Sequence, residues 1–213
     1  SLKQNGNYNL NGTVKNKFFE GSYFSALFNP TIVENYYYGN HFFWENNFKS
    51  KFYNQISAKF KFSNDHFDFF PETKLSSINN YIYFNSNKLP EQHTNQLYYN
   101  DFTLSFNINF LNSLFHFDNK VTYSTVSGKN SKNILRKPKY TYFGKLYYTD
   151  KWFEDKIPIE LGTNLYYRSS YFANAYSPEI QQYYIQNHFK LKNYFLTNIY
   201  FNMKIENLRI FLK

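Results

Sequence analysis

Strict alternation of apolar and polar residues is the feature that most constrains this fold. Across residues 101–110, large apolar side chains occupy the even positions and short polar side chains occupy the odd ones. Successive residues of a strand point to opposite faces of its sheet, so this segment predicts a strand with one apolar and one polar surface. The pattern recurs over residues 48–62. Strands this long and this two-faced are typical of a transmembrane β-barrel, with lipid on one side and water on the other.

The composition agrees with this interpretation. Aromatic residues make up 24% of the 213 residues, yet the mean hydropathy is −0.66, so the chain is polar on average. A barrel combines these two properties because half of every strand faces water. No window holds the roughly 18 consecutive apolar residues that a spanning helix needs. The absence of such a window is therefore no argument against a membrane protein.

The charge and the cysteine content narrow the possible functions. No cysteine is present, which excludes disulfides and thiolate chemistry. The formal net charge of +9 is explained either by a solvated basic surface or by a pore lining that favours anions. Nucleic acid is not a predicted partner, because the charge is dispersed and no nucleic-acid-binding motif occurs. Lys51, Lys59, Lys61, Lys120 and Lys145 all fall on the polar face of a predicted strand, which favours the pore lining. The candidate pore-lining residues are Lys51, Lys59, Lys61, Lys145, Glu160 and Arg168.

The connections between strands form two alternating classes. Short turns lie near residues 14–16, 63–65, 112–113, 151–156 and 206–207, and long polar connections lie near 29–45, 85–96, 128–138 and 173–190. The predicted strands are 2–12, 17–28, 46–62, 67–84, 98–111, 115–127, 139–150, 157–172, 191–204 and 208–213. Short periplasmic turns and long external loops produce this rhythm in outer-membrane barrels. The predicted fold class is therefore all-β: an antiparallel transmembrane barrel of about ten strands, in one domain over residues 1–213.

The ends of the chain suggest that this domain is partial. No signal peptide precedes Ser1, although an exported barrel needs one, and a new alternation that begins at Leu208 is cut short at Lys213. We therefore expect a fragment of a longer protein.

Several local features leave two interpretations open. Pro71 lies inside a predicted strand and predicts a bulge or break there. The aromatic runs at residues 36–38 and 42–44 form either a girdle at the headgroup level or a small cluster that packs the loop. Glu160 and Arg168 share a polar face, either at a constriction or in a structural salt-bridge network. The basic loop of residues 128–139 faces lipopolysaccharide phosphates if it is external, or is a flexible solvated loop.

A search for catalytic and metal-binding motifs gives no candidates. The five histidines are not spaced as metal ligands, and there is no His-Glu-x-x-His, Gly-x-Ser-x-Gly or P-loop motif. Asp65 and Asp68 flank a turn, which capping explains better than paired acid catalysis. The sequence predicts no enzyme activity, no cofactor and no metal site.

Three segments resemble a known family. Residues 78–84, residues 115–123, and the stretch from Tyr-Tyr-Arg at 166–168 to Tyr-Ser-Pro at 176–178 are similar to β-barrel porins of Bacteroidetes-type bacteria, over about residues 20–213. The resemblance implies a single outer-membrane barrel in a Gram-negative host, with no catalytic residues. The chain departs from the family in lacking a signal sequence and an aromatic C-terminal residue.

The function that we expect is passive diffusion of small hydrophilic solutes across the outer membrane, with a weak preference for anions. The alternative is a non-conducting structural or accessory barrel in a larger outer-membrane complex. Expected partners are outer-membrane lipid and lipopolysaccharide, and other outer-membrane proteins in the alternative. An outer-membrane lipase or protease would need a cluster of catalytic residues, which the sequence does not show. A soluble glycan-binding sandwich would not keep all its long loops at one end.

Overall fold

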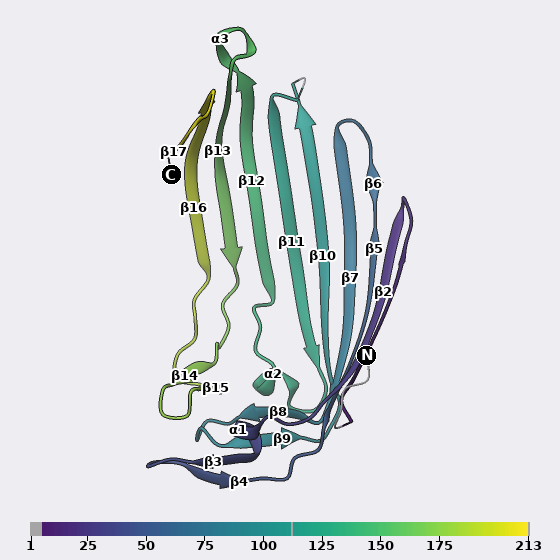
Figure 1. The fold of residues 1–213 in the computed structure, drawn as a ribbon, viewed down its shortest axis with the longest axis vertical. Helices are drawn as coiled ribbons and strands as arrows, with labels where there is room; N and C mark the ends of the chain where they lie inside the picture. Colours follow the sequence, from purple (N-terminus) through teal and green to yellow (C-terminus); the bar gives the residue numbers. More distant parts are fainter. Residues whose placement is uncertain (1–5, 112, 213) are drawn as a thin grey trace.

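Ten long antiparallel strands form one large sheet. The computed structural model describes residues 6–111 and 113–212. The strands pair in chain order. Two-faced strands that are joined by short turns favour this antiparallel pairing of sequence neighbours. They are β1 (Tyr8–Lys15), β2 (Phe19–Phe28), β5 (Lys51–Phe60), β7 (Phe67–Asn79), β10 (Leu97–Phe110), β11 (Phe115–Ser127), β12 (Tyr140–Lys151), β13 (Ile157–Arg168), β16 (Tyr194–Ile205) and β17 (Leu208–Leu212) (Figure 1). A short strand, β6 (Phe62–Ser63), also pairs with β7.

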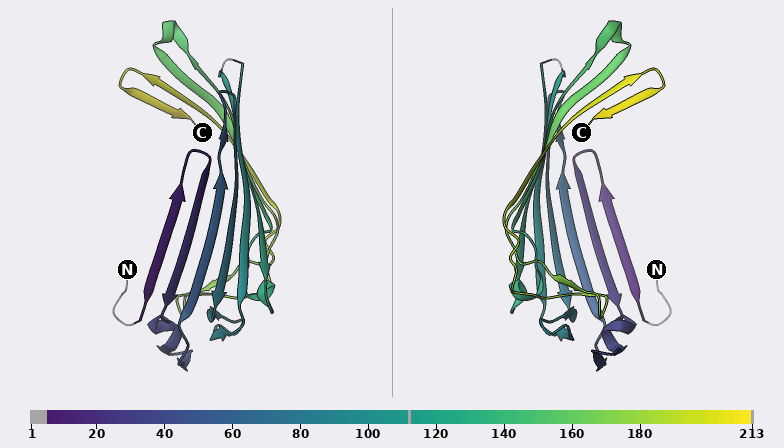
Figure 2. Two further views of the ribbon diagram at one scale, coloured as in Figure 1. Left: turned by 90° about the vertical axis from the view of Figure 1, so that its right-hand side faces the viewer. Right: turned by 90° about the vertical axis from the view of Figure 1, so that its left-hand side faces the viewer.

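The sheet is an open wall over the described residues. β1 and β17 form its two edges, and these strands are not paired with each other. Figure 2 shows the wall strongly curved and twisted, with the β1–β2 and β16–β17 hairpins displaced to the same side of β10 and β11. The fold is thus a curved antiparallel sheet with the predicted order of strands. Closure into a barrel is considered below as a proposal.

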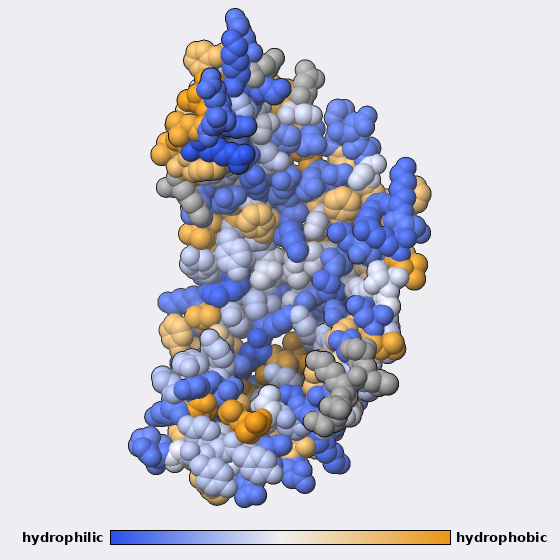
Figure 3. Space-filling model, viewed as in Figure 1, coloured by the Kyte–Doolittle hydropathy of each residue, from blue (hydrophilic) through white to orange (hydrophobic). Residues whose placement is uncertain are grey.

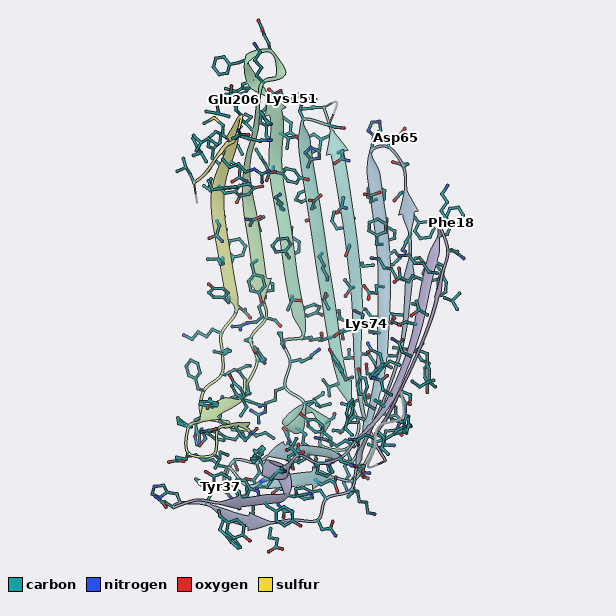
Figure 4. All side chains as sticks on the ribbon, viewed as in Figure 1. Phe18, Tyr37, Asp65, Lys74, Lys151 and Glu206 are labelled. Carbon is teal, nitrogen blue, oxygen red and sulfur yellow. The ribbon has the colours of Figure 1, made fainter. Side chains whose placement is uncertain are left out.

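Short turns join neighbouring strands at one end of the wall. Asn16 and Asn64 organise two of these turns, because each side-chain oxygen accepts hydrogen bonds from two backbone N–H groups ahead of it. In Figure 4, the labelled Asp65, Lys151 and Glu206 lie at this end, and Tyr37 lies at the opposite end. Glu206 has a positive φ of 48°, as the tight β16–β17 reversal requires.

The four long connections fold together at the opposite end, and we call this layer the cap. It comprises residues 29–50, 80–96, 128–139 and 169–193. Its elements are α1 (Ile32–Asn35), β3 (Tyr36–Tyr38), β4 (Phe43–Glu45), β8 (Tyr81–Phe84), β9 (Pro90–His93), α2 (Ser131–Ile134), β14 (Ala175–Ser177) and β15 (Gln182–Tyr184). A further one-turn element, α3 (Trp152–Asp155), lies in a short turn at the other end.

A small hydrophobic core holds the cap together. Trp44, Phe84 and Ile180 are buried against one another, although they come from three different connections. Tyr37 stacks on Trp44 with ring centroids 4.7 Å apart. Strands β14, β15, β8 and β9 make a second sheet that joins the connections of residues 80–96 and 169–193. The long connections are therefore a folded layer rather than independent loops.

This core accounts for half of the aromatic residues in the runs at residues 36–38 and 42–44. Tyr37, Phe42 and Trp44 belong to the cluster that packs the cap, and the indole Nε1 of Trp44 donates a hydrogen bond to the Val33 carbonyl oxygen at 2.9 Å. Tyr36, Tyr38 and Phe43 remain exposed. The cluster interpretation therefore holds for the three packed residues, and a membrane girdle stays a prediction for the exposed ones.

The strand boundaries differ from the predicted ones where the cap begins. The segment predicted as one strand over 67–84 is divided at Asn80, which has a positive φ of 57° and whose side chain donates to the Ser50 carbonyl oxygen. β7 ends before it, and β8 belongs to the cap. The strand predicted over 157–172 ends at Arg168. For the strand predicted over 2–12, residues 2–5 lie outside the described residues, and the described strand is Tyr8–Lys15.

Pro71 interrupts pairing in the neighbouring strand rather than in its own. β7 continues through Pro71, which is paired with Leu104 of β10. On the other side, pairing stops at Lys59 of β5 and resumes at Phe62 of β6. Proline has no N–H to donate, so the ladder opposite it is incomplete. No helix within residues 6–111 and 113–212 is both long and apolar enough to cross a membrane.

Candidate functional site

The register of the strands divides the sheet into two chemically different faces. Residues opposite Phe102, Leu104 and Phe106 in every neighbouring strand share one side, which we call the apolar face. Residues opposite Thr103, Ser105 and Asn107 share the other, which we call the polar face. Figure 3 shows that the side turned toward the viewer in Figure 1 is largely hydrophilic, and the edge hairpins curve toward this side. The polar face is therefore the concave one.

The apolar face carries almost no charge. Following the pairing across all ten described strands, we find one charged residue on it, Asp150, which lies at the turn end of β12. Its apolar side chains are nevertheless exposed: Ile56 is 56% and Ile199 is 70% accessible. Uncharged polar residues such as Asn54 and Asn119 interrupt this face. A surface of exposed aliphatic and aromatic side chains with almost no charge is what a hydrocarbon environment requires.

The polar face carries charges of both signs, with an excess of cations. Its acidic residues are Glu20, Asp68, Glu72, Asp101, Asp118 and Glu160. Its basic residues are Lys15, Lys51, Lys59, Lys74, Lys120, Lys145, Lys151, Arg168, Lys204 and Arg209, with Lys61 beside them through its contact with Glu20. Lys74 is labelled near the middle of the sheet in Figure 4.

Three of the predicted pore-lining lysines are held in ion pairs. Lys51 reaches Glu34 of the cap at 2.8 Å, and Lys61 reaches Glu20 of β2 at 2.7 Å. Lys145 contacts Glu160 at 3.0 Å, so two predicted residues meet each other. Glu160 therefore pairs across the wall with Lys145 and not along its own strand with Arg168. These contacts cross strands, as expected of a salt-bridge network within the wall.

Lys59 and Arg168, the other two predicted cations, have no ion pair among the described residues. The Lys59 Nζ lies 5.2 Å from the Phe70 ring centroid, and its backbone position faces Glu20 and Glu72 in the register. The Arg168 guanidinium lies 5.2 Å from the ring centroid of Tyr171, and its buried Nε has no hydrogen-bond partner. Arg168 stands at the cap end of β13, where it borders the entrance between the wall and the cap.

Four further cations of the polar face also lack an ion pair in the described part of the chain. Lys151 lies at the turn end of β12, opposite Pro158. Lys120 is exposed in the middle of β11, opposite Ser105 and Phe143. Lys204 and Arg209 face each other across the β16–β17 pair. The sequence alternation already places Lys120 on the polar face, and the same alternation marks Lys204 and Arg209, which were not among the predicted residues.

An aromatic and ionic cluster surrounds Lys145. Its Nζ lies 3.9 Å from the Tyr147 ring centroid, and His116, paired with Tyr147 on the same polar face, stacks on that ring with centroids 4.6 Å apart. Both imidazole nitrogens of His116 are within hydrogen-bond distance of side chains, at 2.8 Å from Asn109 and 2.9 Å from Thr149. These contacts give His116 a structural role. No group of three or more His, Cys, Asp or Glu that could hold a metal occurs in the part of the chain that the structure describes.

The cap is attached to the wall by specific polar contacts. Besides its ion pair with Lys51, Glu34 completes a capping box with Thr31 at the start of α1. Lys137, in the connection of residues 128–139, contacts Asp101 of β10 at 3.4 Å. The cap is thus held over one end of the polar face.

An antiparallel sheet with one apolar and one charged face is typical of outer-membrane β-proteins, and the family comparison agrees. Residues 1–213 match the model of the family described as "Putative porin", so the chain belongs to this porin family. No curated protein matches the chain. Membership implies a channel in the outer membrane rather than an enzyme.

Proposed function

We propose that this sheet forms the wall of a closed outer-membrane barrel, through which small hydrophilic solutes diffuse passively. The apolar face contacts lipid, and the polar face lines the aqueous path. Family membership supports a channel. The free edges at β1 and β17 are the positions at which the wall is closed or continued.

The observation that carries this proposal is the absence of charge from the apolar face between its two ends. A lysine or arginine on the lipid face of a barrel costs about 2–4 kcal/mol at the bilayer midplane. The opposite face of the same ten strands holds many charges. A soluble sheet that exposed both faces to water would have no reason to separate charge so completely.

The orientation follows from the connections. Short turns face the periplasm and long loops face the exterior in outer-membrane barrels, which places the cap outside. The cap then narrows the external entrance and selects solutes by size. Its ion pairs with Lys51 and Asp101 support this placement, since they hold it over the polar face.

A weak preference for anions is supported by the balance of unpaired charge. Lysines engage four of the polar-face carboxylates, those of Glu20, Glu72, Asp101 and Glu160. Six cations there have no ion pair in the described residues: Lys59, Lys120, Lys151, Arg168, Lys204 and Arg209. Uncompensated charges of one sign raise the local concentration of the opposite ion in a pore.

Single-channel recording in a planar bilayer tests the proposal. We expect stable ohmic steps, and a reversal potential in a salt gradient that indicates anion selectivity. A folded but silent protein would contradict diffusion, and a cation-selective current would contradict only the charge assignment.

A non-conducting accessory barrel is the second candidate, and the packed cap favours it. The buried cluster of Trp44, Phe84 and Ile180 could make the cap a fixed plug rather than a constriction. In this case the protein would be silent in the bilayer and would co-purify with outer-membrane partners at a fixed stoichiometry. Conductance that appears only after the cap is loosened would distinguish a plug from a wall that does not enclose a pore.

A further inference from the structure

The cap contains a basic pocket at its junction with the wall. The pocket has a volume of about 540 Å³ and lies between the connections of residues 128–139 and 169–193 and the cap end of β11. Its lining includes four cationic side chains and no acidic one: Lys132, Arg136, Lys137 and Lys139. A pocket with convergent charges and an aromatic wall is a common form of ligand site.

Most of the positive charge in this pocket is not neutralised. Lys137 contacts Asp101 at 3.4 Å, and that carboxylate also accepts hydrogen bonds from Ser124 and Tyr99. Lys132 and Lys139 have no ion pair among the described residues. Lys139 instead lies 5.4 Å from the ring centroid of Tyr140. Asp101 therefore compensates one of the four cations.

Arg136 fixes the shape of the pocket without losing its charge to an acid. Its Nη1 donates to the Gln186 carbonyl oxygen, and its Nη2 donates to Asn187 Oδ1 at 2.7 Å. Gln186 is itself buried and bonds the carbonyl oxygens of Ala173 and Phe189. Arg136 thus joins the two connections through neutral acceptors. Burial lowers the pKa of its guanidinium, as expected of a desolvated cation that lacks a carboxylate partner.

Aromatic side chains supply the other side of the pocket. Tyr171 and Phe172 line it, and Phe172 is 37% exposed. The Arg136 guanidinium lies 5.8 Å from the Phe172 ring centroid, and the Lys190 Nζ lies at the same distance from that ring. An anion bound among the lysines would therefore have an apolar ring surface beside it for the body of the ligand.

We propose that this pocket binds a phosphorylated sugar, with the phosphate among Lys132, Arg136 and Lys139 and the sugar against Tyr171 and Phe172. A phosphate monoester suits three uncompensated cations better than a single carboxylate does, because it carries close to two negative charges. Its oxygens also match the N–H groups of arginine. The sugar phosphate is either a soluble solute or the headgroup of an outer-leaflet glycolipid. This site does not depend on conduction through the wall.

Binding is measured by calorimetry on the protein in nanodiscs, in a buffer free of phosphate. Glucose 6-phosphate is the soluble probe, glucose is the uncharged control, and monophosphoryl lipid A incorporated in the nanodisc is the lipid probe. We expect glucose 6-phosphate to bind and glucose not to bind if the source is soluble. If the source is the glycolipid, monophosphoryl lipid A stays bound to the protein and glucose 6-phosphate binds weakly. Failure of both phosphorylated probes to bind would overturn the proposal.

A matched set of variants assigns the binding to this pocket. Lys132→Gln with Lys139→Gln removes the two unpaired lysines and leaves Arg136 in place. We expect binding about tenfold weaker or more, because each lysine makes a charge-assisted contact with the phosphate. Lys17→Gln with Lys129→Gln changes the net charge equally outside the pocket and should leave binding within about twofold of the wild type.

Substitution of the same two lysines by arginine changes both positions but keeps their charge. It therefore separates the loss of charge from a disturbance of the fold. Lys132→Arg with Lys139→Arg keeps both cations and should bind within a few-fold of the wild type. Equal loss in the control pair, or an arginine pair that binds no better than the glutamine pair, would contradict a site built on these cations. Far-UV circular dichroism confirms that each variant retains its strands.

Discussion

The wall and the cap of this protein are stabilised in opposite ways. Among residues 6–111 and 113–212, ten hydrophobic residues are buried. The wall contributes Ala26, Ile159 and Tyr200, and the others lie in the cap or, for Leu97, where β10 meets the cap. The cap therefore has a core that excludes water, and the wall exposes its apolar side chains. A bilayer has to supply the apolar environment of the wall, whereas the cap builds its own.

This difference shows why the two regions have different sequence patterns. A wall strand needs only the correct side chain on each face, so its signal is local and has a period of two. The cap needs Trp44, Phe84 and Ile180 to meet from distant connections, and the local sequence around each residue does not show which partners it meets. Neighbouring substitutions in each region can test the contrast directly.

The largest effect is expected from Trp44→Ala, which removes the centre of the cap core. Truncation of a buried tryptophan costs about 3–5 kcal/mol. Trp44 also donates a hydrogen bond to Val33 and stacks on Tyr37. Hydrogen exchange in nanodiscs should show protection lost across the cap and retained in β10 and β11.

Phe43→Ala is the matched control for this substitution. Phe43 is adjacent to Trp44 in β4 and 61% exposed, so its truncation should change cap protection little. If Trp44→Ala exposed the wall strands to exchange as well, the two regions would not be independently stabilised. An equal effect of both substitutions would contradict the assignment of Trp44 to a specific core.

The next largest effect is expected from Phe106→Arg on the apolar face of β10. This residue lies mid-strand between Phe69 and Asn119, with no charge beside it on that face. An arginine there should lower the free energy of unfolding by about 2–4 kcal/mol if the site is at the bilayer midplane. Equilibrium unfolding by guanidinium in lipid vesicles measures the change.

Asn107→Arg provides the opposite-face control one residue away. Asn107 lies between Asp68 and Asp118 on the polar face, so an arginine there meets two carboxylates and water. We expect a change in stability of less than about 1 kcal/mol. If the two substitutions were equally tolerated, the apolar face would not be in lipid.

The wall could be predicted from the sequence to a large extent, because its determinants are local. The alternation over residues 98–111 predicts β10 to within one residue at each end, and the antiparallel order and the alternation of short and long connections are confirmed. The prediction of one strand over residues 67–84 is wrong at Asn80. The apolar pattern continues past this residue, but its positive φ turns the chain into the cap. The Asn-Asn pair at 79–80 is a turn signal that the alternation concealed.

The ion pairs of the wall could not be predicted, because they depend on register between strands. Lys61 meets Glu20 from a strand 41 residues away, and Lys145 meets Glu160 diagonally across β12 and β13. The sequence placed all these residues on a polar face without showing which charges would be neutralised. Of the five predicted cations, Lys51, Lys61 and Lys145 are held in ion pairs, whereas Lys59 and Arg168 have none among the described residues.

A smaller effect, on ion selectivity, should distinguish the unpaired cations from the paired ones. Lys59→Gln with Lys120→Gln removes two cations that no carboxylate holds in an ion pair. We expect the anion-to-cation permeability ratio to fall by roughly twofold, because the field of the pore lining changes by two charges. Reversal potentials in a potassium chloride gradient measure this ratio.

Lys145→Gln with Glu160→Gln is the corresponding control, because it alters two side chains and leaves the net charge unchanged. We expect the reversal potential of this variant to stay close to that of the wild type. A larger shift in this pair than in the Lys59 and Lys120 pair would place the constriction at β12 and β13. It would also assign selectivity to the paired residues.

The smallest effect is expected in the pH dependence of the cap, through Glu179. The hydrogen bond and charge of Lys88, 2.6 Å away, lower the pKa of this carboxyl group below its ordinary value. A carboxyl group with a lowered pKa stabilises the fold when it is ionised, so its contribution is complete above about pH 4.3 and is lost as the pH falls further. Cap protection in hydrogen exchange should therefore decrease modestly in acid, since this pair is exposed. Glu179→Gln should remove that part of the pH dependence, and the wall strands β10 and β11 should show none of it. If acid loosened the wall before the cap, the ion pairs of the polar face would contribute more to stability than this exposed contact, and the wall would be the more pH-sensitive region.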